Sequence, residues 1–474
     1  MSTIFSKMPK IPVKLHCGDV TGVFEGWRHT IGHGGINRYP LPPRVRDGLA
    51  ALKPRLVRTF IQEYFNICPE RGVCDWSRLD PYMESLAASG GKLVASICIK
   101  PKPLYPVIDE NVVLPNDAGE WKRLIEALVT RYSVERGLVT YWEVANESDI
   151  GEWGGCPYFT QDPAVYNEFY RLTAEAVTRA CPEAKVGGPA LADANSPMME
   201  ELLKYCAATS TRLDFVSWHL YSNDPWAHAG NVRRIRALAE KYYPSERPEM
   251  LVTEMGPGFE EVSVEEMAFD SRRSAAMGAA LFEMMDAKLD WSFYYHIWDQ
   301  VFVADQFRSF YSRIDPMHTH WDKTPHRFGL FGVCGEVRPA YFLYLMLGKM
   351  SGSELRTESC AADLRVKAAL GPDGACRAML VNYGAEGSRD VVAEIDVSGL
   401  SAGLRLMTVY RIDAGRKWEG EKPALLPMER RYVDILTPED SERPFYAQIY
   451  CSADSVAMVC LEEAAEEGMV VANG

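Results

Sequence analysis

The chain has no excess of positive charge and no long apolar segment at its start. Its 474 residues include 51 Lys and Arg against 65 Asp and Glu, which gives a net charge of −14. Because nucleic acids and anionic membranes bind basic surfaces, we expect neither as a partner. Residues 1–7 show no signal peptide or membrane span, so we expect a cytoplasmic protein. A secreted protein trimmed of its signal would look the same.

Paired cysteines and clustered metal ligands are also missing. The twelve Cys are scattered, and none forms a Cys-x-x-Cys motif. We therefore expect free thiols in a reducing compartment. His318 and His320 lie two residues apart but have no further ligand cluster nearby, which favours a loop role and predicts no metal site. The oligomeric state is left open by the sequence.

Short apolar runs alternate with amphipathic helical stretches over most of the chain. Continuous apolar runs are typical of strands buried on both faces. Eight such runs are predicted as strands, at residues 23–30, 56–60, 92–99, 139–145, 184–188, 213–221, 249–254 and 290–297. Eight strand–helix alternations predict an α/β fold, a (β/α)₈ TIM barrel over residues 19–352. A doubly wound sheet is the rival, but residues 32–35 lack the spacing of Gly-x-Gly-x-x-Gly.

The pattern changes after residue 352. Apolar and polar residues alternate at 364–370, 376–382, 391–397, 404–411 and 455–461, with turns between them. This period of two predicts an accessory antiparallel β-sandwich over residues 353–474, including an acidic tail from residue 462. The strand expected at residues 11–15, within residues 1–18, is predicted to join this sandwich because the barrel count is complete without it.

Two carboxylates stand at the ends of apolar runs. Glu147 closes the run 141–147, and Glu254 closes the run 250–254. Functional residues of such barrels lie at the C-terminal ends of the strands, so both side chains are expected at one mouth. There they could approach to about 5 Å, the separation at which one carboxylate attacks a sugar directly. Two facing carboxyls are the apparatus of glycoside hydrolysis.

Other polar and aromatic side chains fall at the same strand ends. We expect these to contact the substrate: Arg58, Lys100, Asn146, His219, Tyr221, Tyr295 and Trp298. A structural role is the alternative for each, because a buried Arg needs an anionic partner in any fold. His219 and Tyr221 share one face of their strand, which favours a role in the site. Glu143 is predicted to be a buried structural partner.

Four further residues follow the first predicted strand. Lining the pocket and packing in the core are equally good interpretations for Trp27, Arg28, His29 and His33.

With these residues the chain resembles clan A of the glycoside hydrolases, and within that clan it most resembles glycoside hydrolase family 39. The segments that carry the resemblance are residues 142–147, residues 214–221, residues 251–254 and a helix opening at Arg338. The β-sandwich built from both ends of the chain also matches. The resemblance covers nearly the whole chain.

The resemblance implies a role for each matching residue. Glu147 would be the general acid and then the general base, and Glu254 the nucleophile. Asn146 would bind the sugar 2-hydroxyl, and His219 would line the site. Arg58 and Tyr221 would donate hydrogen bonds to the nucleophile. Tyr295 or Trp298 would form an aromatic platform for the sugar.

Four positions depart from the pattern of the family. Ala145, Met255 and Tyr295 stand where the family commonly has Trp, and Ser148 stands where it has Pro. These differences bear on the identity of the sugar more than on the chemistry.

The expected function is therefore that of a retaining, exo-acting glycoside hydrolase on β-xylosides or a related β-linked sugar. Double displacement needs no metal or organic cofactor, so none is expected. Activity on arabinosides or uronides is the alternative within the class, and Lys100 would favour a carboxylated sugar if it reached the pocket. A catalytically silent carbohydrate-binding protein and a phosphate-handling barrel enzyme are the alternatives of other classes.

Overall fold

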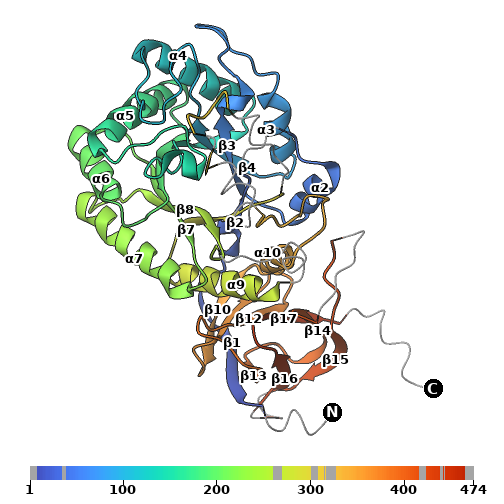
Figure 1. Cartoon of the computed structure of the whole chain (residues 1–474). Helices are drawn as coiled ribbons and strands as arrows, with labels where there is room; N and C mark the ends of the chain where they lie inside the picture. The colour runs from blue at the N-terminus through green and yellow to red at the C-terminus, as the bar shows by residue number, and fades with distance from the viewer. Residues whose placement is uncertain are drawn as a thin grey trace.

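A closed eight-stranded barrel and a separate nine-stranded sheet form the structure, a computed structural model (Figure 1). It describes residues 8–34, 39–259, 270–299, 308–313, 315–316, 327–415, 423–437, 441 and 443–464. His318 and His320 lie outside this part of the chain. Among the described residues, no helix combines the length and apolar character needed to cross a membrane.

The barrel strands are parallel and follow one another in sequence order, β9 pairing with β2 to close the ring. Their bounds are β2 His29–Gly32, β3 Leu56–Gln62, β4 Lys92–Cys98, β5 Val139–Val144, β6 Lys185–Leu191, β7 Phe215–Tyr221, β8 Glu249–Gly256 and β9 Trp291–Tyr295. The predicted TIM barrel is confirmed. Nearly every residue of these strands is buried, as the continuous apolar runs predicted.

The first barrel strand was predicted in the wrong place. Residues 23–30 were expected to form it, but β1 (Lys10–Val23) belongs to the other sheet, and residues 26–28 form the short 3-10 helix η1. The apolar character of this stretch misled the prediction, because Phe24 is buried beside Gly26 and outside the barrel wall. Since β2 begins only at His29, the residues before it lie at the amino-terminal end of the barrel.

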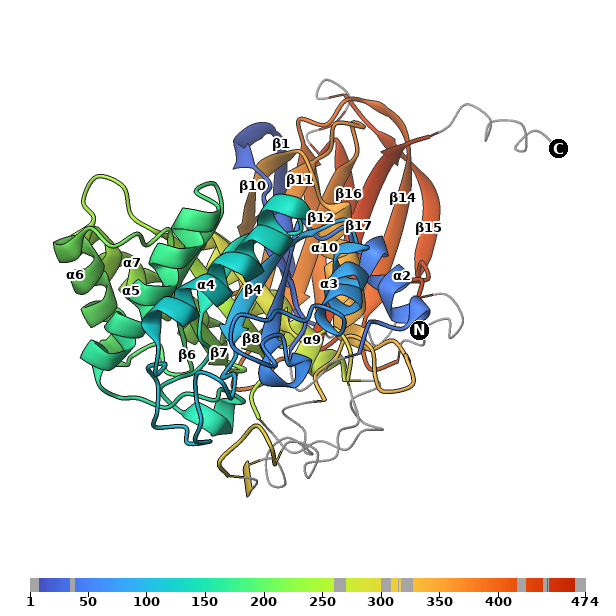
Figure 2. The same ribbon diagram turned by 90° about the horizontal axis from the view of Figure 1, so that it is seen from above.

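Helices surround the barrel on the side away from the second sheet, as Figure 2 shows for α4 to α7. Several begin with a capping side chain followed by Pro, a local signal that fixes the first turn. Asp162 accepts a hydrogen bond from Ala164 N, and Asp224 accepts one from Trp226 N. The helices are α2 Pro43–Ala51, α3 Leu79–Ala87, α4 Ala118–Val129, α5 Pro163–Ala180, α6 Pro197–Thr209, α7 Pro225–Tyr242, α9 Ser271–Asp286 and α10 Pro339–Lys349. The described chain also contains the short 3-10 helices η1 Gly26–Arg28, η2 Glu63–Phe65 and η4 Gly151–Gly154, and the π-helix η3 Thr130–Glu135.

The second sheet has the strand order β15-β14-β17-β12-β11-β10-β1-β13-β16. Besides β1 it contains β10 Ser353–Ser359, β11 Leu364–Leu370, β12 Cys376–Asn382, β13 Val391–Ser398, β14 Gly403–Ile412, β15 Glu429–Ile435, β16 Phe445–Cys451 and β17 Ser455–Glu463. Side chains from all nine strands share one apolar core. The sheet is mixed, because β1 runs parallel to β13; the expectation of purely antiparallel pairing was wrong for this one pair.

The second sheet packs against the barrel through α9 and α10, which lie between the two parts in Figure 1. Alternate residues of β17 serve the two sides. Ala457 and Val459 face the core of the sheet, whereas Val456 and Met458 join the core that contains the two helices. Gly278 of α9 permits this approach, because a Cβ atom there would lie 3.1 Å from Val381. The sheet is therefore buried on both faces where it meets the barrel.

Candidate active site

Arg58 lies at the centre of the barrel mouth, and its side chain is 1% exposed. On β3 the inward positions are Leu56, Arg58 and Phe60, so the guanidinium sits one layer above the apolar floor. Its Nη1 donates to Glu254 Oε1 at 2.8 Å, while Nε and Nη2 donate to Glu143 Oε2 at 2.8 and 2.6 Å. Burial opposes the charge, but the two carboxylates outweigh it and raise the pKa of Arg58. Arg58 therefore stays a cation.

Glu254 reaches the mouth because β8 contains one extra residue. Ser217 pairs with Leu251, yet His219, two residues on, pairs with Glu254 instead of Thr253. The pairing with β9 shows the same offset. Without this bulge the alternation of the strand would turn Glu254 away from the barrel axis.

Both oxygens of Glu254 accept hydrogen bonds. Arg58 donates to Oε1, and the Tyr221 hydroxyl donates to Oε2 at 2.5 Å. Burial and the neighbouring Glu254 hold the pKa of Tyr221 well above its usual value, so this phenol remains a donor. Donors on both oxygens stabilise negative charge on the carboxylate.

Glu147 follows the end of β5 in an unusual backbone conformation. Ala145 and Glu147 have φ angles of 66° and 45°, in the left-handed region that costs energy for residues other than glycine. The Glu147 amide donates to Ala190 O at 2.8 Å, which holds this turn. Burial, and after it the negative charge of Asp149, raises the pKa of Glu147 to about 8. The side chain is therefore a protonated acid at neutral pH.

His219 stands between the two carboxyl groups. Its Nδ1 is 2.6 Å from Glu147 Oε1 and 3.8 Å from Glu254 Oε2. One oxygen of each carboxyl and one imidazole nitrogen all lie within 4.8 Å of one another. Burial lowers the pKa of His219 to about 4, so the ring is neutral and can donate from Nδ1 to Glu147.

The same three residues are the group within the described chain that could hold a metal ion. The chemistry of the donors favours a proton site instead. Both oxygens of Glu254 already accept hydrogen bonds, from Arg58 and from Tyr221. The raised pKa of Glu147 keeps the other carboxyl protonated. A metal ion needs deprotonated ligands.

Hydrogen bonds to both the oxygen and the nitrogen of its side-chain amide fix the orientation of Asn146. Its Oδ1 accepts from Arg58 Nη2 at 2.6 Å, and its Nδ2 donates to Gly154 O at 3.2 Å. One proton of Nδ2 remains for a ligand.

A family model described as glycosyl hydrolases family 39 matches residues 106–413 of the chain. The chain belongs to this family. The beta-xylosidase of Geobacillus stearothermophilus is 32% identical over 117 residues, which are 24% of this chain and 22% of that protein. The beta-xylosidase of Caldicellulosiruptor saccharolyticus is 26% identical over 262 residues, 52% of this chain and 50% of that protein. The alignments thus span at most about half the length of these curated relatives.

Solved structures share the fold over the whole length. A monomeric beta-xylosidase from Caulobacter crescentus CB15 has a TM-score of 0.72 at 19% identity, covering 96% of this chain and 100% of that chain. The GH39 enzyme from Xanthomonas axonopodis pv. citri has a TM-score of 0.73 at 18% identity, covering 96% and 97%.

Aromatic rings form one wall of the mouth in this family 39 chain. Tyr295 is buried, and its ring lies edge-on to that of Tyr221 at 6.1 Å, beside Phe60. Of the two residues predicted as a sugar platform, Tyr295 lies at the mouth, and its role there stays a prediction. Trp298 is half-buried and donates through Nε1 to Val333 O at 3.3 Å.

The structure does not bring Lys100 to the carboxyl pair. Its ammonium donates to the carbonyls of Asp109 and Pro157, the latter at 2.9 Å, and lies between the rings of Tyr105 and Tyr158. Burial lowers its pKa to about 8.

The four residues that follow the first predicted strand lie at two different ends of the barrel. His33 lies at the mouth, buried and stacked 6.1 Å from His296. Trp27, Arg28 and His29 lie at the opposite end, because they precede or begin β2. The interpretation that they line the site was wrong for these three, and the misplaced first strand is the cause.

Two important neighbours of Glu147 were missed. Asp149 accepts from the amides of Ala192 and Asp193 at 3.0 and 2.9 Å. Burial raises the pKa of Asp149, and these two hydrogen bonds oppose that rise by stabilising its negative charge near the acid. Gly154 lies against the acid itself, since a Cβ atom there would lie 2.0 Å from Glu147 Oε2. Asp149 could have been suspected from its position two residues after Glu147, whereas no local signal marks Gly154.

We expect Gly154→Ala to lower kcat by about 100-fold, because the added methyl group must displace the Glu147 carboxyl and small misplacements of catalytic groups have effects of this size. Steady-state kinetics and thermal unfolding check this. Gly230→Ala on α7 is the matched control, because nothing lies within 4 Å of its Cβ position. It should keep full activity and the same or a slightly higher Tm. Full activity of Gly154→Ala would contradict the placement of the acid.

Proposed function

We propose that the protein is a retaining glycoside hydrolase that works by double displacement. The observation that carries the proposal is the carboxyl pair, with oxygens of Glu147 and Glu254 within 4.8 Å and in opposite electrostatic environments. A separation of about 5 Å suits direct attack by one carboxylate, whereas inversion needs a wider gap for a water molecule. Different surroundings give two carboxyl groups different pKa values, and so one can act as the acid and the other as the nucleophile.

In the first step Glu254 attacks the anomeric carbon while Glu147 gives its proton to the departing oxygen. Arg58 and Tyr221 hold Glu254 in position and stabilise its charge before the attack. The second proton of Asn146 Nδ2 is available to the sugar 2-hydroxyl, a contact that strengthens in the oxocarbenium-like transition state.

In the second step the ester on Glu254 carries no charge, so Glu147 ionises more readily than before. It then removes a proton from water, which attacks the anomeric carbon and releases the sugar with its configuration retained. The neutral His219, donating to Glu147 Oε1, leaves the other oxygen of the acid for these proton transfers.

The proposed substrate is an exo-cleaved β-xyloside or a related β-linked neutral sugar. Two curated relatives are beta-xylosidases, which supports this choice. Lys100 gives no support to a carboxylated sugar, because backbone carbonyls accept the hydrogen bonds of its ammonium group. Part of the predicted rim, residues 300–307, 314 and 317–326, lies outside the described chain.

A panel of aryl α- and β-glycosides tests the proposal, with the anomer of the first product followed by NMR. We expect hydrolysis of a β-glycoside, xyloside above the others, with the β-anomer released first. Release of the α-anomer would disprove the retaining mechanism. Binding of sugars without turnover of any glycoside would instead favour a carbohydrate-binding protein.

A further inference from the structure

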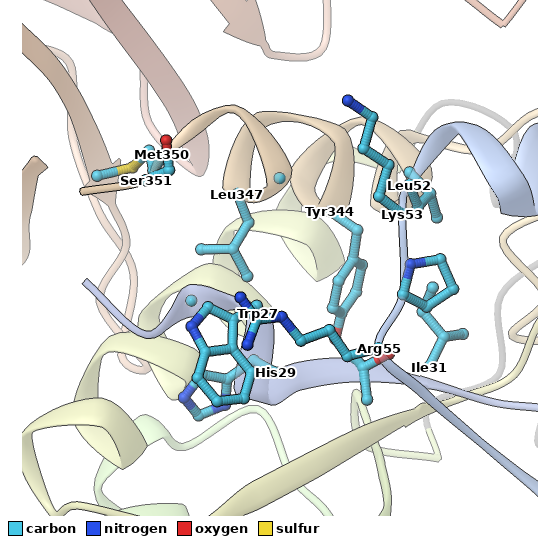
Figure 3. Close-up of a pocket in the computed structure, with 14 residues that line it drawn as sticks. Trp27, His29, Ile31, Leu52, Lys53, Arg55, Tyr344, Leu347, Met350 and Ser351 are labelled. Atoms are coloured by element: carbon cyan, nitrogen blue, oxygen red, sulfur yellow. The ribbon is translucent and has the colours of Figure 1, made fainter. Parts of the chain in front are cut away.

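A second cavity lies at the end of the barrel opposite the carboxyl pair. It has a volume of about 240 Å³ and opens between the start of β2, the turn before β3 and the end of α10 (Figure 3). The residues that matter for its chemistry are Trp27, His29, Lys53, Arg55, Tyr344 and Leu347. Drug-sized ligands occupy cavities of about 300 to 1,000 Å³, so this one suits a molecule near the size of a monosaccharide.

Arg55 offers an unused guanidinium to this cavity. Its Cζ lies 3.8 Å from the centre of the Trp27 ring, and Figure 3 shows the side chain reaching across toward that ring. Within the described chain it has no carboxylate partner and no side-chain hydrogen bond, and Lys53 at the rim has none either. Stacking on Trp27 holds the planar fork of donors in place, which is the arrangement that binds a carboxylate through two parallel hydrogen bonds.

Tyr344 adds a buried hydroxyl without a partner among the described residues. The side chain is 4% exposed, and Figure 3 shows it descending from α10 beside Arg55. This hydroxyl oxygen is itself shielded, so the ring of Tyr344 and not its oxygen forms the wall of the cavity. His29 Nδ1 is hydrogen-bonded to the Ser292 hydroxyl at 2.8 Å. Burial lowers the pKa of His29 to about 3, so its ring lines the cavity without a charge.

The charge around the cavity selects the ligand further. Among the described residues no Asp or Glu lines it, although the chain as a whole is strongly acidic. Leu347 and Gly348 of the last turn of α10 line one side of the cavity, and the carbonyl end of a helix favours hydrogen-bond donors over a bare anion. A ligand that satisfies both sides carries a carboxylate for Arg55 and hydroxyl groups for the helix end.

We infer that this cavity binds a small hydroxylated carboxylate of sugar-acid size. The inference is independent of the proposed hydrolysis, since no residue of the cavity belongs to the carboxyl pair or its partners. It also gives the protein a site that can respond to acidic sugars while the mouth acts on neutral ones.

Isothermal titration of the full chain with D-glucuronate tests the inference, with D-glucose and inorganic phosphate as comparison ligands. We expect glucuronate to bind and the other two to bind at least about tenfold more weakly. Arg55→Gln should raise the Kd for glucuronate at least about tenfold, because it removes a charge-assisted hydrogen bond. Arg233→Gln on the exposed face of α7 removes the same charge elsewhere and should leave the Kd unchanged.

Two readouts separate this cavity from the mouth. Lys53→Gln, which removes the second cation at the rim, should raise the Kd several-fold without lowering the Tm. Both Arg55→Gln and Lys53→Gln should keep the turnover of an aryl glycoside. Equal binding of glucose or phosphate would overturn the inference, and so would glucuronate binding that Arg55→Gln does not weaken.

Discussion

Glu254→Gln should lose at least about 10⁴-fold in kcat while the chain folds as before, an effect of the size seen when other enzymes lose their nucleophile. The amide has the same shape and can still accept from Arg58, but it cannot form the glycosyl ester. Steady-state hydrolysis of an aryl glycoside measures the loss, and circular dichroism confirms the fold.

Glu283→Gln is the matched control for this substitution. Glu283 is also a buried carboxylate paired with an arginine, Arg365 at 2.8 Å, but it lies on α9 where the barrel meets the second sheet. Its loss should leave kcat unchanged. A second test uses azide with Glu254→Ala, where the small nucleophile enters the vacated space and yields the α-glycosyl azide. Turnover of Glu254→Gln at the level of the natural chain would disprove the assignment of the nucleophile.

Glu147→Gln should show a loss that depends on the leaving group. Departing groups that need a proton should react about 10² to 10⁴-fold more slowly, the usual contribution of general acid catalysis. Dinitrophenyl glycosides need no proton, so their first step should be nearly unaffected and a pre-steady-state burst should appear. Azide should then speed turnover and yield the β-glycosyl azide, the opposite anomer from that of Glu254→Ala.

The same variant should change the pH profile. The pKa of Glu147 is raised to about 8, so the natural enzyme holds the catalytic proton below that pH and loses it above. We therefore expect kcat/KM to fall as the pH rises through about 8, and this fall to be absent in Glu147→Gln. An identical alkaline fall in both proteins would assign the titration to another group.

The sequence predicted the barrel and the positions of the two carboxyls well because both depend on local patterns. Continuous apolar runs mark strands buried on two faces, and Glu147 and Glu254 each end such a run. The strands at 364–370 and 376–382 were predicted to the residue, since alternation and flanking turns define them.

Features that depend on distant parts of the chain were not predictable. The extra residue in β8 is visible only in its pairing with β7 and β9. Gly154 matters because of its distance to Glu147, and Lys100 turned toward backbone carbonyls that no sequence pattern reveals. β1 of the second sheet ends at Val23 and β2 of the barrel begins at His29, and the mixed residues between them show no periodicity that marks either boundary.

The sheet that follows the barrel has a consequence for how this protein can be altered. Because Val456 and Met458 of β17 and Val381 of β12 are part of the core that contains α9 and α10, removing residues 353–464 would expose the apolar surface of two barrel helices. We therefore expect the barrel and the sheet to unfold together in one cooperative transition and not as two independent domains. Transfer of the whole barrel into another protein would therefore have to include the sheet.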